Sequence, residues 1–475
     1  MKLSKKYVVG LAATAIVGSF GLTGVAHAAT ITGGGATFPM NLMESCRATF
    51  AGDTTANAAG DKMDYTGVGS GTGRANFFKG DYKFAMSDSL WKTSEITTAA
   101  ATSGGATRTA TNFVFMPLIS GAINVAYNLE GVKPEGTVLQ MSSATVAKIF
   151  AAQITKWNDP AILADNPVAA QPQLLGLNGQ AKFVLAKGKK ATQALLTATL
   201  TTKVVDKKTK NLIITSSVDG GKTVKNVYNK KPIVGKLSLT VPYAVGTVYS
   251  ITLDKALLGT VSVDATTVTL PDTAITVYKR KETSGTTNNF ANYLNQAQPT
   301  IWTKATNDAF DTAFPGTVPT DGSFVAAQGN DGVANGVMGK NGAIGYAEVS
   351  FVNERQLAGK SIASAKIKNG AGEFIAGSSA GARLAVSAAA TDATTGIVTF
   401  NYGNTVSGAY PITAVSYGMA NTAGFDTSAN NTIVKNYVNY VLDTCAPAVA
   451  EIKGYAQLPA NLVTISKALA AKIGA

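Results

Sequence analysis

Histidine is almost missing from this sequence: among 475 residues the only one is His27. If residue 27 is removed on maturation, Ser-His-Asp and Cys-His catalysis, histidine general bases and histidine metal ligands are all excluded. The two cysteines, Cys46 and Cys445, are too few for a cysteine-rich zinc or iron–sulfur site. We therefore expect no catalytic residue, no metal and no cofactor, although carboxylate chemistry with Mg²⁺ or Ca²⁺ stays open.

The first 28 residues have the pattern of an export signal. Lys2, Lys5 and Lys6 give a positive start, residues 7–24 are small and apolar, and Ala-His-Ala at 26–28 has the form of a cleavage site. The alternative is an uncleaved membrane anchor, because the apolar run is long enough to span a bilayer. We predict cleavage near Ala28, which removes His27 and places the protein in the periplasm or at the cell surface. In such an oxidising compartment the two cysteines can form one disulfide.

Charge is scarce and unevenly spread. Charged residues make up 15% of the chain, against about 25% in an average globular protein. The formal net charge is +13, and residues 168–272 contribute +9 through 14 lysines, no arginine and 5 aspartates. This segment consists of short β-branched runs separated by Gly, Asn and Pro, at a spacing typical of a β-sandwich or small barrel. We predict that residues 173–272 form an inserted, lysine-rich, all-β domain.

Outside this segment, predicted strands alternate with predicted helices. Residues 40–50, 144–153, 284–295 and 431–445 carry apolar side chains at helical spacing, and residues 114–127 are rich in strand formers. Alternation of this kind is typical of α/β layers around a mostly parallel sheet.

Three segments combine glycine with serine or threonine where the chain turns into a predicted helix. They are TGGGATFP at 32–39, GVGSGTG at 67–73 and RKETSGT at 280–286. The first N–H groups of a helix have no partner within the helix, and glycine lets an oxyanion approach them. Each segment alone is weak evidence, because such a pattern is more often an ordinary helix cap, and none fits a nucleotide-binding motif. Taken with Arg280 and Asp88, the set favours an oxyanion site.

The sequence resembles the phosphate-binding proteins of Pst-type phosphate ABC transporters, the PstS family. The similar stretches follow the family order and cover most of the mature chain outside about 168–272. They are residues 32–39, DYTGVGSG at 64–71, FAMSD at 84–88, ITKWNDP at 154–160, RKETSGT at 280–286, GNDGV at 329–333, GAIGYAE at 342–348 and YPIT at 410–413.

The resemblance implies a set of phosphate-binding residues. Thr37 and Phe38 would offer backbone N–H groups, and Ser70 a hydroxyl. Asp88 would accept a hydrogen bond from the proton of the phosphate. Arg280 would pair with the anion, beside donors from Ser284, Gly285 and Thr286 at a helix start. Glu282 stands where many relatives have Asp and would orient Arg280, and Thr283 stands where Gly is common, so both departures leave the local contacts open.

The resemblance also implies the architecture. The fold class is α/β, a two-lobed periplasmic-binding-protein fold of type II with a hinge and the inserted all-β domain. Lobe I would hold residues 29–117 and 405–475, and lobe II residues 118–172 and 273–404. Because the family topology places both chain ends in one lobe, we predict a Cys46–Cys445 disulfide. The expected partners are inorganic phosphate and the permease subunits of an ABC transporter, and the expected state is a monomer.

The sequence is compatible with three alternative functions. The first is a receptor for phosphate or another oxyanion, which the resemblance favours. The second is a cell-surface scaffold or adhesion protein that uses the insert. The third is a phosphate-releasing enzyme, which the absence of histidine from the mature chain disfavours. The insert itself is a spacer, a partner-binding domain, or a docking module for an anionic cell-envelope polymer. Nucleic acid is not expected, because the insert lacks arginine and its aromatic residues do not interleave with its lysines.

Overall fold

The computed structural model describes residues 28–103, 109–133, 135–166, 173–175, 181–187, 193–200, 211–218, 222–232, 234–242, 247–262, 268–422 and 424–475. The predicted export signal therefore lies outside the described residues, apart from Ala28. No helix in the described ranges is long and apolar enough to cross a membrane.

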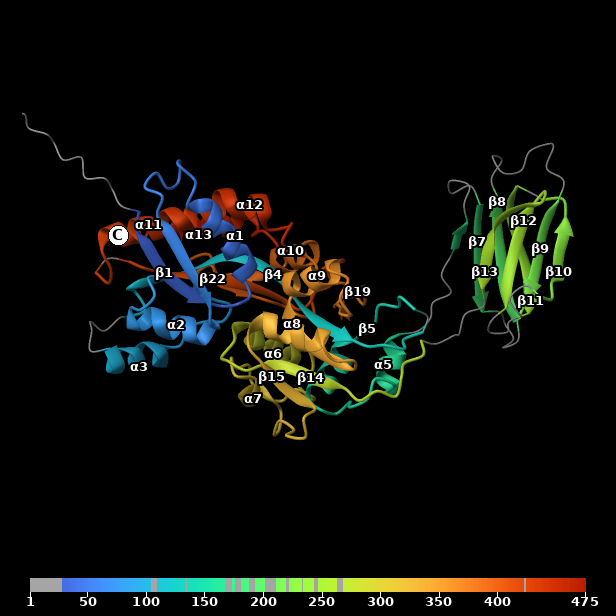
Figure 1. The fold of residues 1–475 in the computed structure, drawn as a ribbon, viewed down its shortest axis with the longest axis horizontal. Coiled ribbons are helices and arrows are strands. Elements are labelled where there is room, and N and C mark those ends of the chain that lie inside the picture. The colour runs from blue at the N-terminus through green and yellow to red at the C-terminus, as the bar shows by residue number, and fades with distance from the viewer. Residues whose placement is uncertain are drawn as a thin grey trace, which may run out of the picture.

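One nine-stranded sheet runs through both lobes of the main body (Figure 1). Strand β4 is sixteen residues long and entirely buried. It pairs with β22 over its first part and with β16 over its last part, so the two lobes share it. The order is β15 (Phe324–Ala327), β14 (Thr276–Arg280), β16 (Ala343–Glu348), β4 (Phe113–Asn128), β22 (Thr413–Asn421), β3 (Phe84–Ser87), β1 (Thr30–Gly35) and β2 (Lys62–Gly67), with β17 (Ala363–Ser364) also on β4.

The expectation of a mostly parallel sheet was wrong. The pairs β1–β2 and β1–β3 in lobe I and β14–β15 and β14–β16 in lobe II are parallel. The pairs that β4 and β22 make are antiparallel. A fully buried strand is a continuous apolar run whichever way its neighbours point, so the sequence of β4 carries no signal of pairing direction.

Helices cover both faces of the lobe I sheet: Figure 1 shows α1, α11 and α13 on one side and α2 and α3 on the other. The helices predicted at 40–50, 144–153, 284–295 and 431–445 are present as α1, α4, α6 and α11 with its π-helical continuation. In lobe I lie α1 (Met40–Phe50), α2 (Ser70–Lys79), α3 (Thr93–Ser103), α11 (Ser428–Tyr440), η1 (Val441–Cys445), α12 (Ala446–Val449) and α13 (Ala460–Ala470).

The helices α4 to α9 belong to lobe II, and α10 packs on β4 and β22. Their bounds are α4 (Ser143–Phe150), α5 (Pro160–Asp165), α6 (Gly285–Ala297), α7 (Phe310–Ala313), α8 (Gly329–Met338), α9 (Val349–Leu357) and α10 (Ser379–Ser387). Small sheets complete the body: β5 (Gln140–Met141) with β18 (Lys366–Lys368) and β19 (Phe374–Ile375), and β20 (Ala390–Thr391) with β21 (Val398–Thr399).

A disulfide joins the first helix to the end of η1. Cys46 and Cys445 are bonded across a sequence separation of 399 residues, and both are buried in the main core. The predicted pairing is confirmed, and the bond ties the beginning of lobe I to its end.

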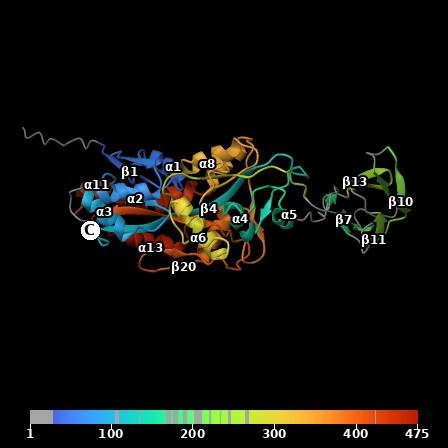
Figure 2. The ribbon, with the colours of Figure 1, turned by 90° about the horizontal axis from the view of Figure 1, so that it is seen from below.

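The insert is all-β and has its own core, as predicted; Figures 1 and 2 show its strands apart from the main body. Two antiparallel four-stranded sheets enclose one apolar cluster that includes Leu196, Ile214, Tyr249 and Ile251. This is a sandwich rather than a barrel. The sheets are β10 (Lys225–Lys230), β9 (Leu212–Ser217), β12 (Val248–Leu253) and β13 (Ala256–Ser262), and β11 (Gly235–Pro242), β8 (Gln193–Leu200), β7 (Ala181–Lys187) and β6 (Gln173–Leu175).

The chain rejoins lobe II before residue 272. Val268 and Leu270 are buried in the main core, and Thr269 pairs with Lys133. The returning segment therefore belongs structurally to lobe II from Val268 onward.

Candidate functional site

The eight residues proposed from the sequence come from four chain segments that converge between the lobes. Thr37 and Phe38 lie between β1 and α1, Ser70 begins α2, and Asp88 directly follows β3. Because β1, β2 and β3 are parallel, their carboxyl ends lie at one edge of the sheet, where sites of α/β folds form. From lobe II, Arg280 ends β14, and residues 284–286 begin α6.

Arg280 is buried and is held on two sides. Its Nη2 donates to Thr37 Oγ1 of the other lobe at 2.8 Å, and its Nε donates to Glu282 Oε1 at 2.8 Å. Its Nη1 is also buried but has no hydrogen-bond partner in the described part of the chain. A buried, unpaired guanidinium nitrogen is costly unless an acceptor reaches it. The geometry thus leaves one charged donor for an anion.

Glu282 contacts Arg280, although its side chain is one methylene longer than the Asp of many relatives. Besides Arg280, it accepts from the Gly329 N–H at 3.2 Å. Both unusual loop residues lie against α2 of lobe I: a Cβ on Gly69 would lie 2.7 Å from Glu282 Cγ, and one on Gly71 would clash with Thr283. Glu282 and Thr283, the two residues that differ from the family pattern, therefore pack against Gly69 and Gly71 of the other lobe.

Asp88 is buried, and only one of its two carboxylate oxygens accepts a short hydrogen bond. Its Oδ1 accepts from Ser416 Oγ at 2.7 Å, while its Oδ2 has only a long 3.5 Å contact from Thr286 Oγ1. Burial raises the pKa of the Asp88 carboxyl to about 7, opposed by the Ser416 hydrogen bond and by the charge of Arg280. The carboxyl group can therefore hold or release a proton near neutral pH.

Helix starts supply neutral donors around this carboxyl group. The backbone N–H groups of Phe38, Ser70, Gly285 and Thr286 donate to no protein atom in the described ranges, as expected for the first turns of helices. A Cβ on Gly285 would lie 2.5 Å from Ser70 Oγ and 2.7 Å from Asp88 Cβ. Glycine at this position therefore lets the start of α6 approach lobe I closely.

The hydroxyl groups of Thr37, Ser70 and Ser284 act as acceptors toward the protein. Thr37 Oγ1 accepts from Arg280 and from Asn330 Nδ2 at 3.0 Å. Ser70 Oγ accepts from the Asp88 N–H at 3.2 Å, and Ser284 Oγ caps α6 by accepting from the Thr287 N–H at 3.2 Å. Since each lone pair used leaves the O–H free, all three hydroxyls retain a proton to donate to an anion.

Four polar residues around the site were missed from the sequence. Asn330 lies within the 329–333 stretch that resembles the family, but no role was assigned to it. Ser416 in β22 gave no signal at all. Arg74 and Asp308 are buried and pair with each other across the lobes at 2.7 Å. Sequence reasoning could not find this pair, since 234 residues separate its members.

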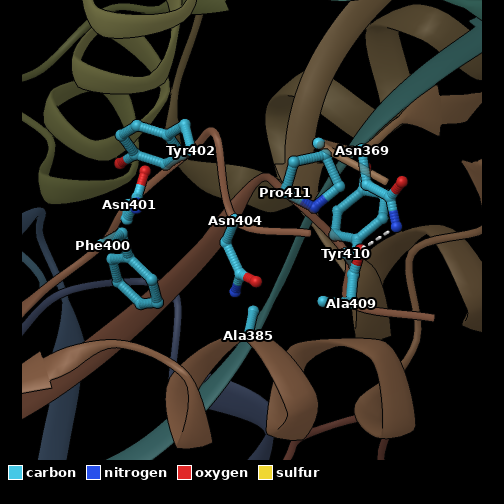
Figure 3. A pocket seen from close by; sticks show the side chains of 10 residues that line it. Asn369, Ala385, Phe400, Asn401, Tyr402, Asn404, Ala409, Tyr410 and Pro411 are labelled. Atoms are coloured by element: carbon cyan, nitrogen blue, oxygen red, sulfur yellow. Dashed lines mark hydrogen bonds between the residues drawn. The ribbon is translucent and has the colours of Figure 1, made fainter. Parts of the chain in front are cut away.

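A hollow lies away from these residues, beside α10 and the segment that precedes β22. Figure 3 shows its aromatic and amide lining, with Asn369 Nδ2 donating to the Ala409 carbonyl oxygen at 3.2 Å. None of the eight proposed residues lines it. Within the described ranges, no group of three His, Cys, Asp or Glu side chains is placed to hold a metal.

Comparison with known proteins gives consistent matches. The sequence model of one family, described as a PBP superfamily domain, matches residues 23–249 and 252–444. The phosphate-binding protein PstS of Xylella fastidiosa (strain Temecula1) is 23% identical over 434 residues, 91% of this chain and 82% of that protein.

Two solved structures share the fold. A soluble ancestral variant of the human phosphate binding protein superposes with a TM-score of 0.56 at 18% identity, over 93% of each chain. The periplasmic phosphate-binding protein PfluDING, solved with bound phosphate, gives a TM-score of 0.54 at 18% identity, over 92% of this chain and 93% of its own. These likenesses confirm the two-lobed α/β fold.

Proposed function

We propose that this chain, which belongs to the PBP superfamily, captures inorganic phosphate between its two lobes and delivers it to the permease of an ABC transporter. Its relatives PstS and PfluDING are named as phosphate-binding proteins. The role is capture and delivery rather than catalysis. We further propose that the protein works outside the cytoplasm as a monomer.

The observation that carries the proposal is that one buried site holds both a charged hydrogen-bond donor and a charged hydrogen-bond acceptor. Arg280 offers an unpaired Nη1, and Asp88 offers an acceptor oxygen, close enough together that the charge of Arg280 lowers the pKa of Asp88. An anion with no proton satisfies Arg280 and the helix N–H groups but leaves Asp88 facing a bare oxygen. A protonated phosphate satisfies both, because its P–OH donates to the carboxylate.

This arrangement selects phosphate over sulfate above neutral pH, where Asp88 is mostly ionised. Phosphate retains a proton there, and sulfate has none. A hydrogen bond to a charged group contributes about 1.5–3 kcal/mol, so losing it lowers affinity by roughly tenfold to more than a hundredfold. Facing the carboxylate with a bare sulfate oxygen adds repulsion.

The test is calorimetric titration of phosphate into residues 29–475, comparing the wild type with Arg280→Lys. Lysine keeps a positive charge beside Glu282 but cannot reproduce the planar fork, so affinity should fall at least tenfold. Arg355→Lys is the matched control, because Arg355 pairs with Asp331 outside the site. Equal affinities for wild type and Arg280→Lys would overturn the role of Arg280.

For the insert we propose docking to an anionic cell-envelope polymer. Six lysines in the described part of the insert are exposed: Lys222, Lys225, Lys230 and Lys231 lie on or beside β10, Lys236 lies on β11, and Lys255 lies in the turn before β13. Exposed cations of one sign attract polyanions through salt-sensitive, long-range forces. Cosedimentation with poly(glycerol phosphate)-coated beads should be strong in low salt and lost near 0.5 M NaCl. Exchanging Lys222, Lys225, Lys230 and Lys231 for Gln should remove it; persistence would contradict the proposal.

A further inference from the structure

Arg74 is a buried arginine whose N–H groups are almost all engaged within lobe I. Its Nε and Nη2 donate to Glu95 at 3.0 and 2.7 Å, and its Nη1 donates to Ser87 Oγ at 2.8 Å and Ser89 Oγ at 2.7 Å. Ser87 and Ser89 flank Asp88. Arg74 therefore fixes the loop that carries the acceptor carboxylate of the proposed phosphate site.

Among the partners of Arg74 in the described part of the chain, Asp308 is the one that comes from lobe II. Its Oδ2 accepts from Arg74 Nη2 at 2.7 Å and from Ser89 Oγ at 3.1 Å. Its Oδ1 accepts from Asn288 Nδ2 at 2.8 Å, and its carbonyl oxygen accepts from the Ser284 N–H at 2.9 Å. Both Asn288 and Ser284 belong to the first turns of α6 or its cap. Asp308 therefore binds the start of α6 through Oδ1 and its carbonyl oxygen, and binds lobe I through Oδ2.

We propose that the Arg74–Asp308 ion pair is a closure latch, in which Asp308 acts as a positioning residue that brings the α6 start of lobe II against the Asp88 loop of lobe I. The proposal rests on the proposed function. In a molecule whose lobes separate, the contacts of Arg74 to Glu95, Ser87 and Ser89 persist, while those to Asp308 are lost. An interaction made only in the closed form raises the closed population, and apparent affinity is proportional to that population.

The charges around the pair show why both partners matter. Glu95 and Asp308 together face a single guanidinium, and Asp308 also raises the pKa of Asp88 by charge repulsion. Without Arg74, two carboxylates of opposite lobes would repel each other beside the anion. Arg74 thus converts a repulsive approach of the lobes into an attractive one.

The experiment compares Asp308→Asn with Asp311→Asn in the full mature chain. Asp311 lies three residues away and pairs with Lys279 inside lobe II, so its substitution is a matched control. We expect Asp308→Asn to weaken phosphate binding at least tenfold through a faster dissociation rate, and Asp311→Asn to leave it unchanged. The melting temperature of the phosphate-free protein should be about equal in both variants, because replacing Asp with Asn leaves the size of the side chain unchanged at both positions.

Two further readouts keep the outcome decisive. Hydrogen exchange of the backbone amides at 69–73 and 282–286 reports closure without phosphate and should accelerate in Asp308→Asn. Arg74→Lys, which keeps the charge beside Glu95, should reproduce the faster dissociation even if Asp308→Asn misfolds. Unchanged dissociation rates and unchanged exchange in both variants would overturn the latch. If wild-type protein binds no phosphate, the proposed function fails, and the exchange readout alone then decides the latch.

Discussion

At the residue scale, Asp88 and Glu348 are buried carboxyl groups with raised pKa values. Asp88 faces the proposed anion, and Glu348 lies at the end of β16 where Ser350 and Tyr455 meet it. The sequence resemblance was sufficient to propose Asp88 and the contact between Arg280 and Glu282. It could not reveal Ser416, Asn330 or Asp308, because a single polar residue in a strand or loop has no periodicity that marks its tertiary neighbours.

Sulfate binding should depend on pH through Asp88. With a pKa of about 7, the carboxyl group is increasingly protonated below neutral pH, and a protonated Asp88 can donate to a sulfate oxygen. Sulfate affinity should therefore fall about tenfold per unit as the pH rises above 7, and level off below it. Titrations between pH 5.5 and 8.5 measure this. Asp88→Asn should bind sulfate with little pH dependence; a wild-type sulfate affinity that is flat with pH would contradict the assignment.

Glu348 should make the phosphate-free protein more stable in mild acid. Burial raises its pKa to about 8, against 4.5 in the unfolded chain. Between these values the folded state holds a proton that the unfolded state has lost, so stability decreases as the pH rises toward 8, by up to about 1.4 kcal/mol per unit. Urea unfolding at pH 6 and pH 8 tests this. Glu348→Gln should reduce the difference in unfolding free energy between pH 6 and pH 8. If the variant shows the same difference as the wild type, a group other than Glu348 causes it.

At the element scale, helix positions were predictable and strand directions were not. The apolar spacing at 284–295 located α6, and the chain stops α4 at Phe150 shortly before Ala152, which has a positive φ of 59°. The interlobe contact of α2 depends on a feature invisible in sequence, the fit of Gly71 against Thr283.

Gly71→Ala should impair binding without impairing folding. Alanine is favoured over glycine in a helix by about 1 kcal/mol, so α2 itself gains stability. The added methyl group, however, collides with Thr283 of the other lobe and resists closure. Phosphate affinity should fall at least tenfold by calorimetry. Gly332→Ala in α8, where the nearest atom lies at an ordinary 3.5 Å, is the control and should bind normally. Equal binding by both variants would argue against a tight interlobe fit.

At the scale of the whole molecule, the insert and the two-lobed body have separate hydrophobic cores. Composition identified the insert from its lysines and β-branched runs, and each unit buries its own apolar cluster. The point of return could not be predicted, because Val268 and Leu270 resemble the strand residues before them yet pack in lobe II.

Removing residues 173–262 should leave phosphate binding intact. The deletion keeps the Val268 and Leu270 contacts, so the main core is not opened. The shortened chain should fold cooperatively and bind phosphate within about threefold of the full chain, measured by calorimetry, while losing the polyanion binding proposed for the insert. Loss of phosphate binding in a folded deletion variant would show that the insert takes part in the site.

The role of Asp88 in selecting phosphate is measured by titrating phosphate and then sulfate at pH 8 into anion-stripped protein, with Asp88→Asn beside the wild type. We expect tight one-to-one phosphate binding with no sulfate signal in the wild type, and a smaller difference in affinity between the two anions in the variant. Equally tight sulfate binding by the wild type, or binding of neither anion, would contradict this expectation.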